Sequence, residues 1–113
     1  MEKLTPNPKD LDPIETASRD EIEALQFHRM KRSLKHAFEN SPFYRKKFIE
    51  ADVHPEDLKT LRDIAKFPFC DKKTERETQH VGSFFGEMCS VPEEEVIFMA
   101  TSSGSTGVPT VSP

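Results

Sequence analysis

The chain has 113 residues, of which 32% are charged, and a formal net charge of −4 with an isoelectric point near 5.6. This length allows one small domain, and the acidic balance gives no electrostatic footprint for nucleic acid or an anionic membrane. No apolar run approaches the ~20 residues of a membrane span, and the first residues lack the basic-then-apolar order of a secretion signal, so a cytoplasmic location is expected.

The first half of the chain is predicted to be an arm followed by helices. Residues 1–17 hold three of the nine prolines and show no periodicity, which indicates an extended arm. Ser18 and Glu21 have the spacing of a capping box, so a helix is expected to begin there. Ser41 and Pro42 predict the start of a second helix, because serine caps well and proline costs nothing at the first position. The first helix has a broad apolar arc at the helical period, made of Ile22, Phe27, Met30, Leu34, Ala37 and Phe38.

Shorter elements are expected after these two helices. The second helix is expected to end near Ala51. A third is predicted from residues 54–57 onward, broken at residues 67–69 by a Phe-Pro-Phe sequence. Asp71 is a candidate cap for a fourth, weaker helix, and residues 82–92 read as irregular structure. The apolar side chains expected to reach a core from the second and third helices are Phe43, Tyr44, Phe48, Leu58, Leu61 and Ile64.

The character of the sequence changes near residue 96. Residues 96–100 are continuously apolar, which is typical of a strand buried on both faces. Residues 108–111 are a candidate return strand. A lone buried strand after several helices does not complete a sheet, so it needs neighbours that this chain does not contain. The abrupt end at Pro113 therefore indicates a piece of a larger protein.

The segment between these two apolar stretches is the main candidate site. Its glycines allow positive φ angles and a close approach of backbone N–H groups to an anion, and its hydroxyls add neutral donors. Such a loop could hold a polyphosphate, although it lacks the lysine of a Walker motif. A flexible linker is the simpler alternative, but apolar segments anchor this loop at both ends. The candidate phosphate-binding residues are Ser102, Ser103, Gly104, Ser105, Thr106 and Gly107.

Residues 100–110 closely resemble the phosphate-binding signature of the adenylate-forming superfamily, and in particular its phenylacetate-CoA ligase branch. The resemblance extends over roughly residues 11–113. Four upstream pieces match that branch in order and spacing: residues 12–16, the stretch from Arg19, residues 39–44 and residues 66–69.

The resemblance implies that the chain is mainly α-helical and belongs to a longer α/β enzyme. Residues 18–92 would form its helical N-terminal segment, and residues 93–113 the first strand and phosphate loop of its large AMP-binding domain. The parent would use ATP and Mg²⁺ to form an aryl-acyl adenylate and then a CoA thioester, and a homodimer is left open. The lysine that many relatives carry beside the motif's proline is replaced here by Val108 or Thr110, which leaves charge neutralisation to Mg²⁺ and backbone dipoles. No catalytic residue is assigned within the chain.

Other interpretations compete with this one. A catalytically inactive fragment or a helical interaction module would retain only the loop. The four histidines and two cysteines have no zinc-site spacing, so no metal site is predicted. A basic cluster could contact CoA phosphates or nucleic acid, although a solvated helix face is favoured; it comprises His28, Arg29, Lys31, Arg32, Lys35, His36 and residues 45–47.

Overall fold

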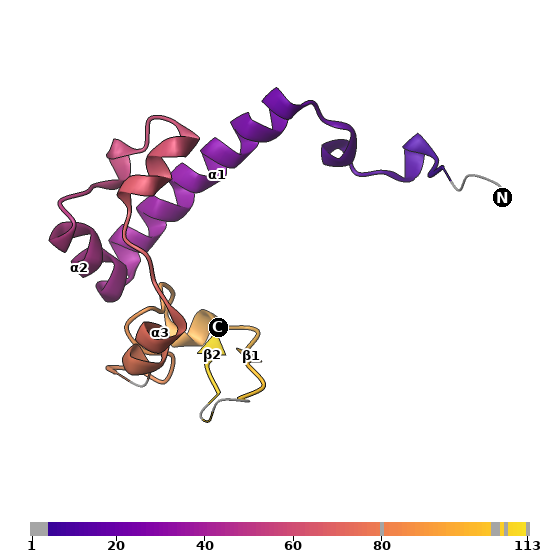
Figure 1. The fold of residues 1–113 in the computed structure, drawn as a ribbon. Coiled ribbons are helices and arrows are strands. Elements are labelled where there is room, and N and C mark those ends of the chain that lie inside the picture. The colour runs from indigo at the N-terminus through magenta and orange to yellow at the C-terminus, as the bar shows by residue number, and fades with distance from the viewer. Residues whose placement is uncertain (1–4, 80, 105–106, 108, 113) are drawn as a thin grey trace.

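A computed structural model describes residues 5–79, 81–104, 107 and 109–112. The longest element is helix α1 (Arg19–Asn40), followed at once by helix α2 (Pro42–Glu50). The residues before α1 project away from the other elements (Figure 1) and carry two short 3-10 turns, η1 (Pro8–Asp10) and η2 (Pro13–Thr16). Both turns begin at a proline, whose fixed φ suits a first helical position.

The two helix starts predicted from the sequence are confirmed. At the start of α1, the Ser18 N–H donates to Glu21 Oε2 at 2.7 Å, and the Glu21 N–H donates to Ser18 Oγ at 3.3 Å. Ser41 caps α2 by accepting from the Tyr44 N–H at 3.4 Å. The guanidinium of Arg45 donates to the carbonyl oxygen of Phe38 at 2.8 Å and also to that of Glu39. Because these carbonyls belong to the last turn of α1, Arg45 stabilises the sharp junction between the helices.

The predicted third helix is wrong. Residues 54–66 instead form two separate 3-10 turns, η3 (Pro55–Asp57) and η4 (Leu61–Lys66), which pack on α1. Asp57 accepts from the His54 N–H at 2.7 Å, and Asp63 accepts from the Thr60 N–H at 2.6 Å. These local hydrogen bonds close two short turns in place of one continuous helix.

The hydrophobic core lies between α1, α2 and these turns. Leu58 is completely buried, and Phe48 packs edge-on against Phe67 with ring centroids 5.2 Å apart. The apolar arc of α1 covers this cluster, as its periodicity predicted. The buried members are Phe48, Val53, Leu58 and Phe67, with Phe27, Met30, Leu34, Phe38 and Tyr44 packed against them.

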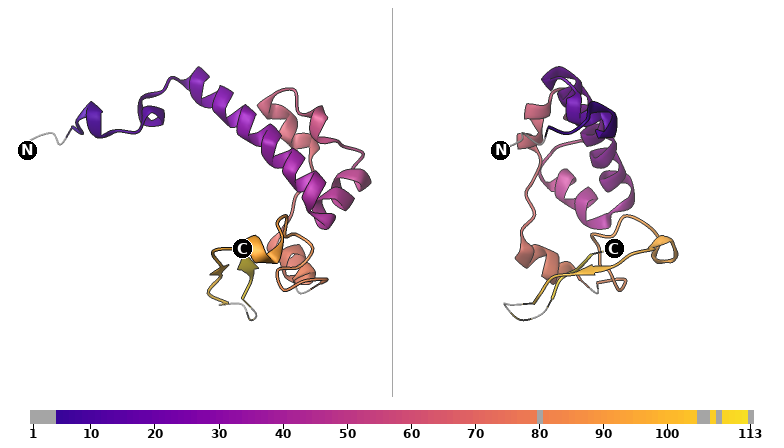
Figure 2. Two further views of the ribbon diagram at one scale, coloured as in Figure 1. Left: turned by 180° about the vertical axis from the view of Figure 1, so that it is seen from behind. Right: turned by 90° about the vertical axis from the view of Figure 1, so that its right-hand side faces the viewer.

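A smaller C-terminal module lies beside the junction of α1 and α2 (Figures 1 and 2). It contains helix α3 (Lys72–Thr78), the turn η5 (Glu93–Glu95), and strands β1 (Ala100–Thr101) and β2 (Val111–Ser112). Asp71 caps α3 by accepting from the Thr74 N–H at 2.7 Å, as expected. The strands are antiparallel, with Ala100 opposite Ser112 and Thr101 opposite Val111.

The predicted buried strand is wrong over most of its length. Residues 96–99 have no strand pairing, and Ile97 is fully exposed, Phe98 73% exposed and Met99 50% exposed. The apolar run indicates a segment that is suited to burial. Burial on both faces requires neighbouring strands, and the described part of the chain supplies only a two-residue partner strand. The described part of the chain is thus mostly helical, with one short two-stranded sheet.

No helix in the described part of the chain has the length and apolar content to cross a bilayer.

Candidate functional site

The candidate phosphate loop is closed at its neck by a reciprocal pair of hydrogen bonds. The Ser102 N–H donates to the Thr110 carbonyl oxygen at 2.9 Å, and the Thr110 N–H donates to Ser102 Oγ at 2.9 Å. These bonds extend the pairing of β1 and β2 by one position, and Thr110 is only 6% exposed. The two ends of the loop are therefore fixed to each other, unlike those of a free linker.

A tight turn lies within the loop. The Gly107 N–H donates to the Gly104 carbonyl oxygen at 2.9 Å, and φ is +67° at Gly104 and +123° at Gly107, values that L side chains rarely adopt. A Cβ on Gly104 would also lie 2.9 Å from Pro109 Cγ. Glycine is thus required at position 104 both by the backbone angle and by the approach of Pro109.

The structure brings together part of the predicted site. Ser102 is at the neck, Ser103 is exposed beside it, and Gly104 and Gly107 form the turn. Ser105 and Thr106 lie outside the described residues. Among the residues that can be placed, Ser102 uses its hydroxyl to hold the neck, a structural role that sequence reasoning did not distinguish from ligand binding.

Gln79 connects the loop to the helical part of the module. Its side-chain Nε2 donates to the Val111 carbonyl oxygen at 2.9 Å, so the residue just after α3 holds β2 in place. Sequence reasoning missed Gln79, because the contact joins residues 32 positions apart and no local pattern indicates it.

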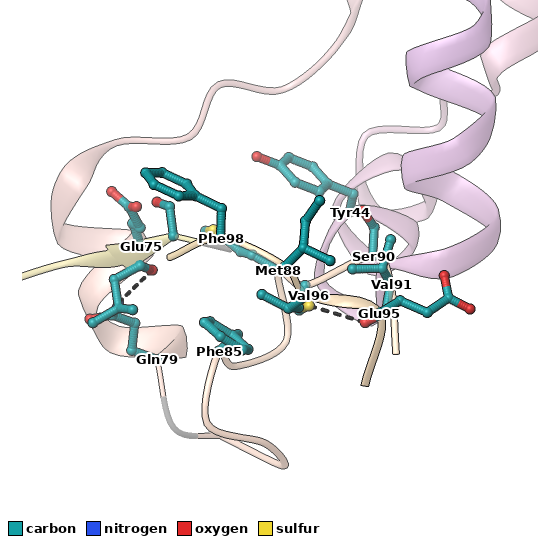
Figure 3. Close-up of a pocket in the computed structure, with 14 residues that line it drawn as sticks. Tyr44, Glu75, Gln79, Phe85, Met88, Ser90, Val91, Glu95, Val96 and Phe98 are labelled. Carbon is teal, nitrogen blue, oxygen red and sulfur yellow. Dashed lines mark hydrogen bonds between the residues drawn. The ribbon is translucent and has the colours of Figure 1, made fainter. Parts of the chain in front are cut away.

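A hollow of about 540 Å³ lies next to these strands (Figure 3). Phe85, Met88 and Val96 gather in it, with Tyr44 from α2 on one side and Glu75 from α3 on the other. Val111 and Ser112 of β2 also line it, so one wall of the hollow continues into the candidate loop. Its lining combines apolar side chains with polar ones, among them the carboxylates of Glu75 and Glu95.

Two groups at or beside this hollow, the Tyr44 phenol and the Cys70 thiol, have raised pKa values. Burial raises the pKa of the Tyr44 phenol, with a further contribution from Cys70 nearby. Burial also raises the pKa of the Cys70 thiol, and the acidic side chains of Glu75 and Asp71 act in the same direction. A thiol with a raised pKa is a weak nucleophile at neutral pH, so Cys70 has no sign of activation.

The described residues contain no group of three or more His, Cys, Asp or Glu side chains arranged to hold a metal ion.

Comparison with known proteins identifies clear relatives, although no protein-family model matches the chain. The chain is 52% identical over 111 residues to phenylacetate-coenzyme A ligase of Aromatoleum evansii, covering 98% of the chain and 24% of that protein. It is 50% identical over 101 residues to phenylacetate-coenzyme A ligase of Escherichia coli K12, covering 89% of the chain and 22% of the relative. The chain thus spans about a quarter of the length of these relatives.

Solved structures of a 2-hydroxyisobutyryl-CoA ligase resemble the fold. One, in complex with 2-HIB-AMP and CoA in the thioesterification state, has a TM-score of 0.75 and 31% identity, over 95% of this chain and 24% of that one. Another, an open conformation with 2-HIB-AMP and CoA, has a TM-score of 0.74 and 33% identity, over 85% of this chain and 22% of that one. The resemblance drawn from the loop and the upstream pieces is confirmed.

Proposed function

We propose that this chain, which is homologous along nearly its whole length to part of the phenylacetate-coenzyme A ligases, is the N-terminal part of an ATP-dependent acid–thiol ligase. The whole protein would activate an aryl acid such as phenylacetate as its adenylate and transfer the acyl group to CoA. The single observation that best supports this is the 52% identity across 98% of the chain. In this proposal residues 18–92 form a helical segment, and residues 93–113 begin the large nucleotide-binding domain.

The loop residues 102–107 would hold the β- and γ-phosphates of ATP. The described geometry suits this role: Gly104 and Gly107 have positive φ, Ser103 is exposed, and the neck of the loop is closed. When bound, ATP supplies the adenylyl group that activates the carboxylate, and Mg²⁺ shares the phosphate charge. The loop would orient the polyphosphate with neutral N–H and hydroxyl donors.

Thr110 occupies one of the two positions, beside the proline of the motif, where many relatives carry a lysine. Its side chain is nearly buried and its backbone is bound to Ser102 in both directions. Position 110 is thus part of the closed neck, where a cation would lose hydration. The proposal therefore assigns charge neutralisation to Mg²⁺, to backbone dipoles and to residues beyond this chain.

A chimera tests the proposal. The corresponding segment of the Escherichia coli relative is replaced by this chain, and phenylacetate-dependent exchange between ATP and pyrophosphate is measured. We expect exchange in the chimera and a loss of at least about tenfold in its Gly104→Ala variant, because a small displacement of bound phosphates is costly in rate.

Gly82→Ala is the matched control. Gly82 also has a positive φ, +76°, but a Cβ there meets no atom within 4 Å. It should change exchange by no more than about twofold, since only a local backbone strain is added. Equal exchange in the chimera and in Gly104→Ala would show that the loop is only a turn, and the proposal would fail.

A further inference from the structure

The outer edge of β2 is held by a side chain from outside the sheet. Ser102 and Thr110 form a hydrogen-bonded position of the β1–β2 pair. At the next position Thr101 lies opposite Val111, and in an antiparallel pair the backbone groups at such a position point away from the partner strand. The Val111 carbonyl oxygen accepts instead from Gln79 Nε2 at 2.9 Å (Figure 3). Within the described residues, Gln79 thus takes the place of a neighbouring strand.

Gln79 acts one residue away from the neck of the candidate loop. Val111, whose carbonyl oxygen accepts the hydrogen bond, directly follows Thr110. Thr110 in turn is bonded to Ser102 in both directions. Because the chain enters and leaves the loop through this neck, a displacement of β2 at Val111 also displaces the loop.

The backbone of Gln79 is fixed by a close contact at the end of α3. Gln79 directly follows Thr78, the last residue of that helix, and is half-buried. A Cβ on Gly86 would lie 2.1 Å from the Thr78 carbonyl oxygen and 2.9 Å from Gln79 Cα. Only glycine fits so near, so the chain around Gly86 packs directly on the backbone that carries Gln79.

Glu87 connects this contact to α2. The Glu87 N–H donates to the Thr78 carbonyl oxygen at 3.3 Å. The Glu87 carbonyl oxygen accepts from the hydroxyl of Ser41, the buried residue that caps α2. A connection of hydrogen bonds and packed backbone thus runs from the start of α2, through Glu87 and Gln79, to β2.

We infer that Gln79 is a positioning residue for the phosphate loop and fixes where that loop presents its donors to ATP. Gln79 acts through β2 and the neck of the loop and does not itself contact the nucleotide. Its amide donates to the Val111 carbonyl oxygen, whereas a carboxylate of the same size only accepts hydrogen bonds and would repel that oxygen. This inference rests on the proposed function, in which residues 102–107 hold the β- and γ-phosphates.

Replacement of Gln79 in the Escherichia coli chimera tests this role. Gln79→Glu should raise the KM for ATP in the exchange reaction at least about fivefold, because displaced donors bind the phosphates less well. The KM for phenylacetate should stay within about twofold. A purely structural defect would lower kcat by reducing the number of active molecules, and both KM values would remain unchanged.

Two further variants distinguish the lost hydrogen bond from the added charge. Gln79→Met keeps a long unbranched side chain without a donor, and it should also raise the KM for ATP. A normal KM in Gln79→Met would assign the effect to charge and overturn the inference. Gln26→Glu changes the chain's other glutamine, which is exposed on α1, and should leave the KM within about twofold. An equal effect of Gln26→Glu would also overturn it.

Hydrogen exchange in the 113-residue chain tests the hold on the neck without any nucleotide. In Gln79→Glu, the N–H groups of Ser102 and Thr110 should exchange at least about tenfold faster than in the unmodified chain, because the neck opens locally more often. The N–H of Leu34, in the middle of α1, should be unaffected. Equal acceleration at Leu34, or none at the neck, would overturn the positioning role.

The chimera also separates this inference from the proposed function. Absence of exchange between ATP and pyrophosphate in the unmodified chimera would contradict the proposed function itself. An active unmodified chimera whose KM for ATP is not altered by Gln79→Glu would refute the role of Gln79 alone.

Discussion

The hydroxyl of Ser41 donates a hydrogen bond to the carbonyl oxygen of Glu87 at 3.0 Å, across 46 positions of sequence. The Phe43 N–H donates to the same carbonyl oxygen at 3.2 Å. Ser41 is completely buried and also caps α2 through the Tyr44 N–H. One side chain thus begins a helix and attaches the C-terminal module to the helical core.

Replacement of Ser41 should therefore cost more than replacement of an ordinary cap. Ser18→Ala removes only the cap of α1 and should lower the free energy of unfolding by about 1 kcal/mol. Ser41→Ala also removes the part-buried hydrogen bond to the Glu87 carbonyl oxygen, so a loss of about 2 kcal/mol is expected. Urea unfolding of both variants checks this; losses of equal size would show that the contact with Glu87 contributes nothing.

Asp63 should make stability depend on pH. Its carboxylate lies 2.8 Å from Lys66 Nζ and accepts from the Thr60 N–H and hydroxyl, and these contacts hold the pKa of Asp63 well below its usual range. A carboxylate with a lowered folded-state pKa stabilises the fold above its unfolded pKa of about 4 and loses that contribution as the pH falls toward the folded value.

Asp63→Asn should accordingly lower the melting temperature at pH 7, and the difference from the unmodified chain should shrink as the pH falls below about 4. Thermal unfolding followed by circular dichroism over this range measures it. Asp52→Asn, at an exposed position of the α2–η3 connection, is a control for removal of a carboxylate. A difference for Asp63→Asn that stays constant down to pH 2 would contradict the assignment.

The exposed apolar segment should make the 113-residue chain self-associate. Ile97 and Phe98 are adjacent and are 100% and 73% exposed, and contiguous apolar surface of this kind favours association. The variant Ile97→Thr/Phe98→Thr should weaken self-association by at least about tenfold in sedimentation equilibrium, because less apolar area is buried between copies.

Phe69→Ser supplies the control for this experiment. Phe69 is 96% exposed but lies outside the 96–99 segment, so its replacement should leave association nearly unchanged. A chain that is monomeric before any substitution would disprove the prediction, as would an equal effect of both variants.

The features that sequence predicted correctly are those with a local physical cause. The capping box at Ser18, the cap and proline at the start of α2, and the cap at Asp71 all depend on residues within one helical turn. The apolar arc of α1 depends on a period that repeats across the whole helix.

The errors arose where distant contacts or side-chain competition decide the outcome. Asp57 and Asp63 turned a predicted helix into two 3-10 turns through hydrogen bonds to nearby backbone N–H groups. The apolar run at residues 96–99 indicated burial, which depends on surfaces absent from the described part of the chain. Gln79 holds β2 through a hydrogen bond to Val111, and Ser41 holds the Glu87 carbonyl oxygen. Both hydrogen bonds join residues far apart in sequence, so no local sequence pattern could predict them.

The most direct measurement is the structure of the Escherichia coli chimera bound to a non-hydrolysable ATP analogue and Mg²⁺. We expect N–H or hydroxyl groups of residues 102–107 to lie within about 3.2 Å of the β- or γ-phosphate oxygens, while the Ser102–Thr110 neck remains closed. A bound nucleotide whose phosphates lie beyond hydrogen-bonding distance of that loop would contradict the account.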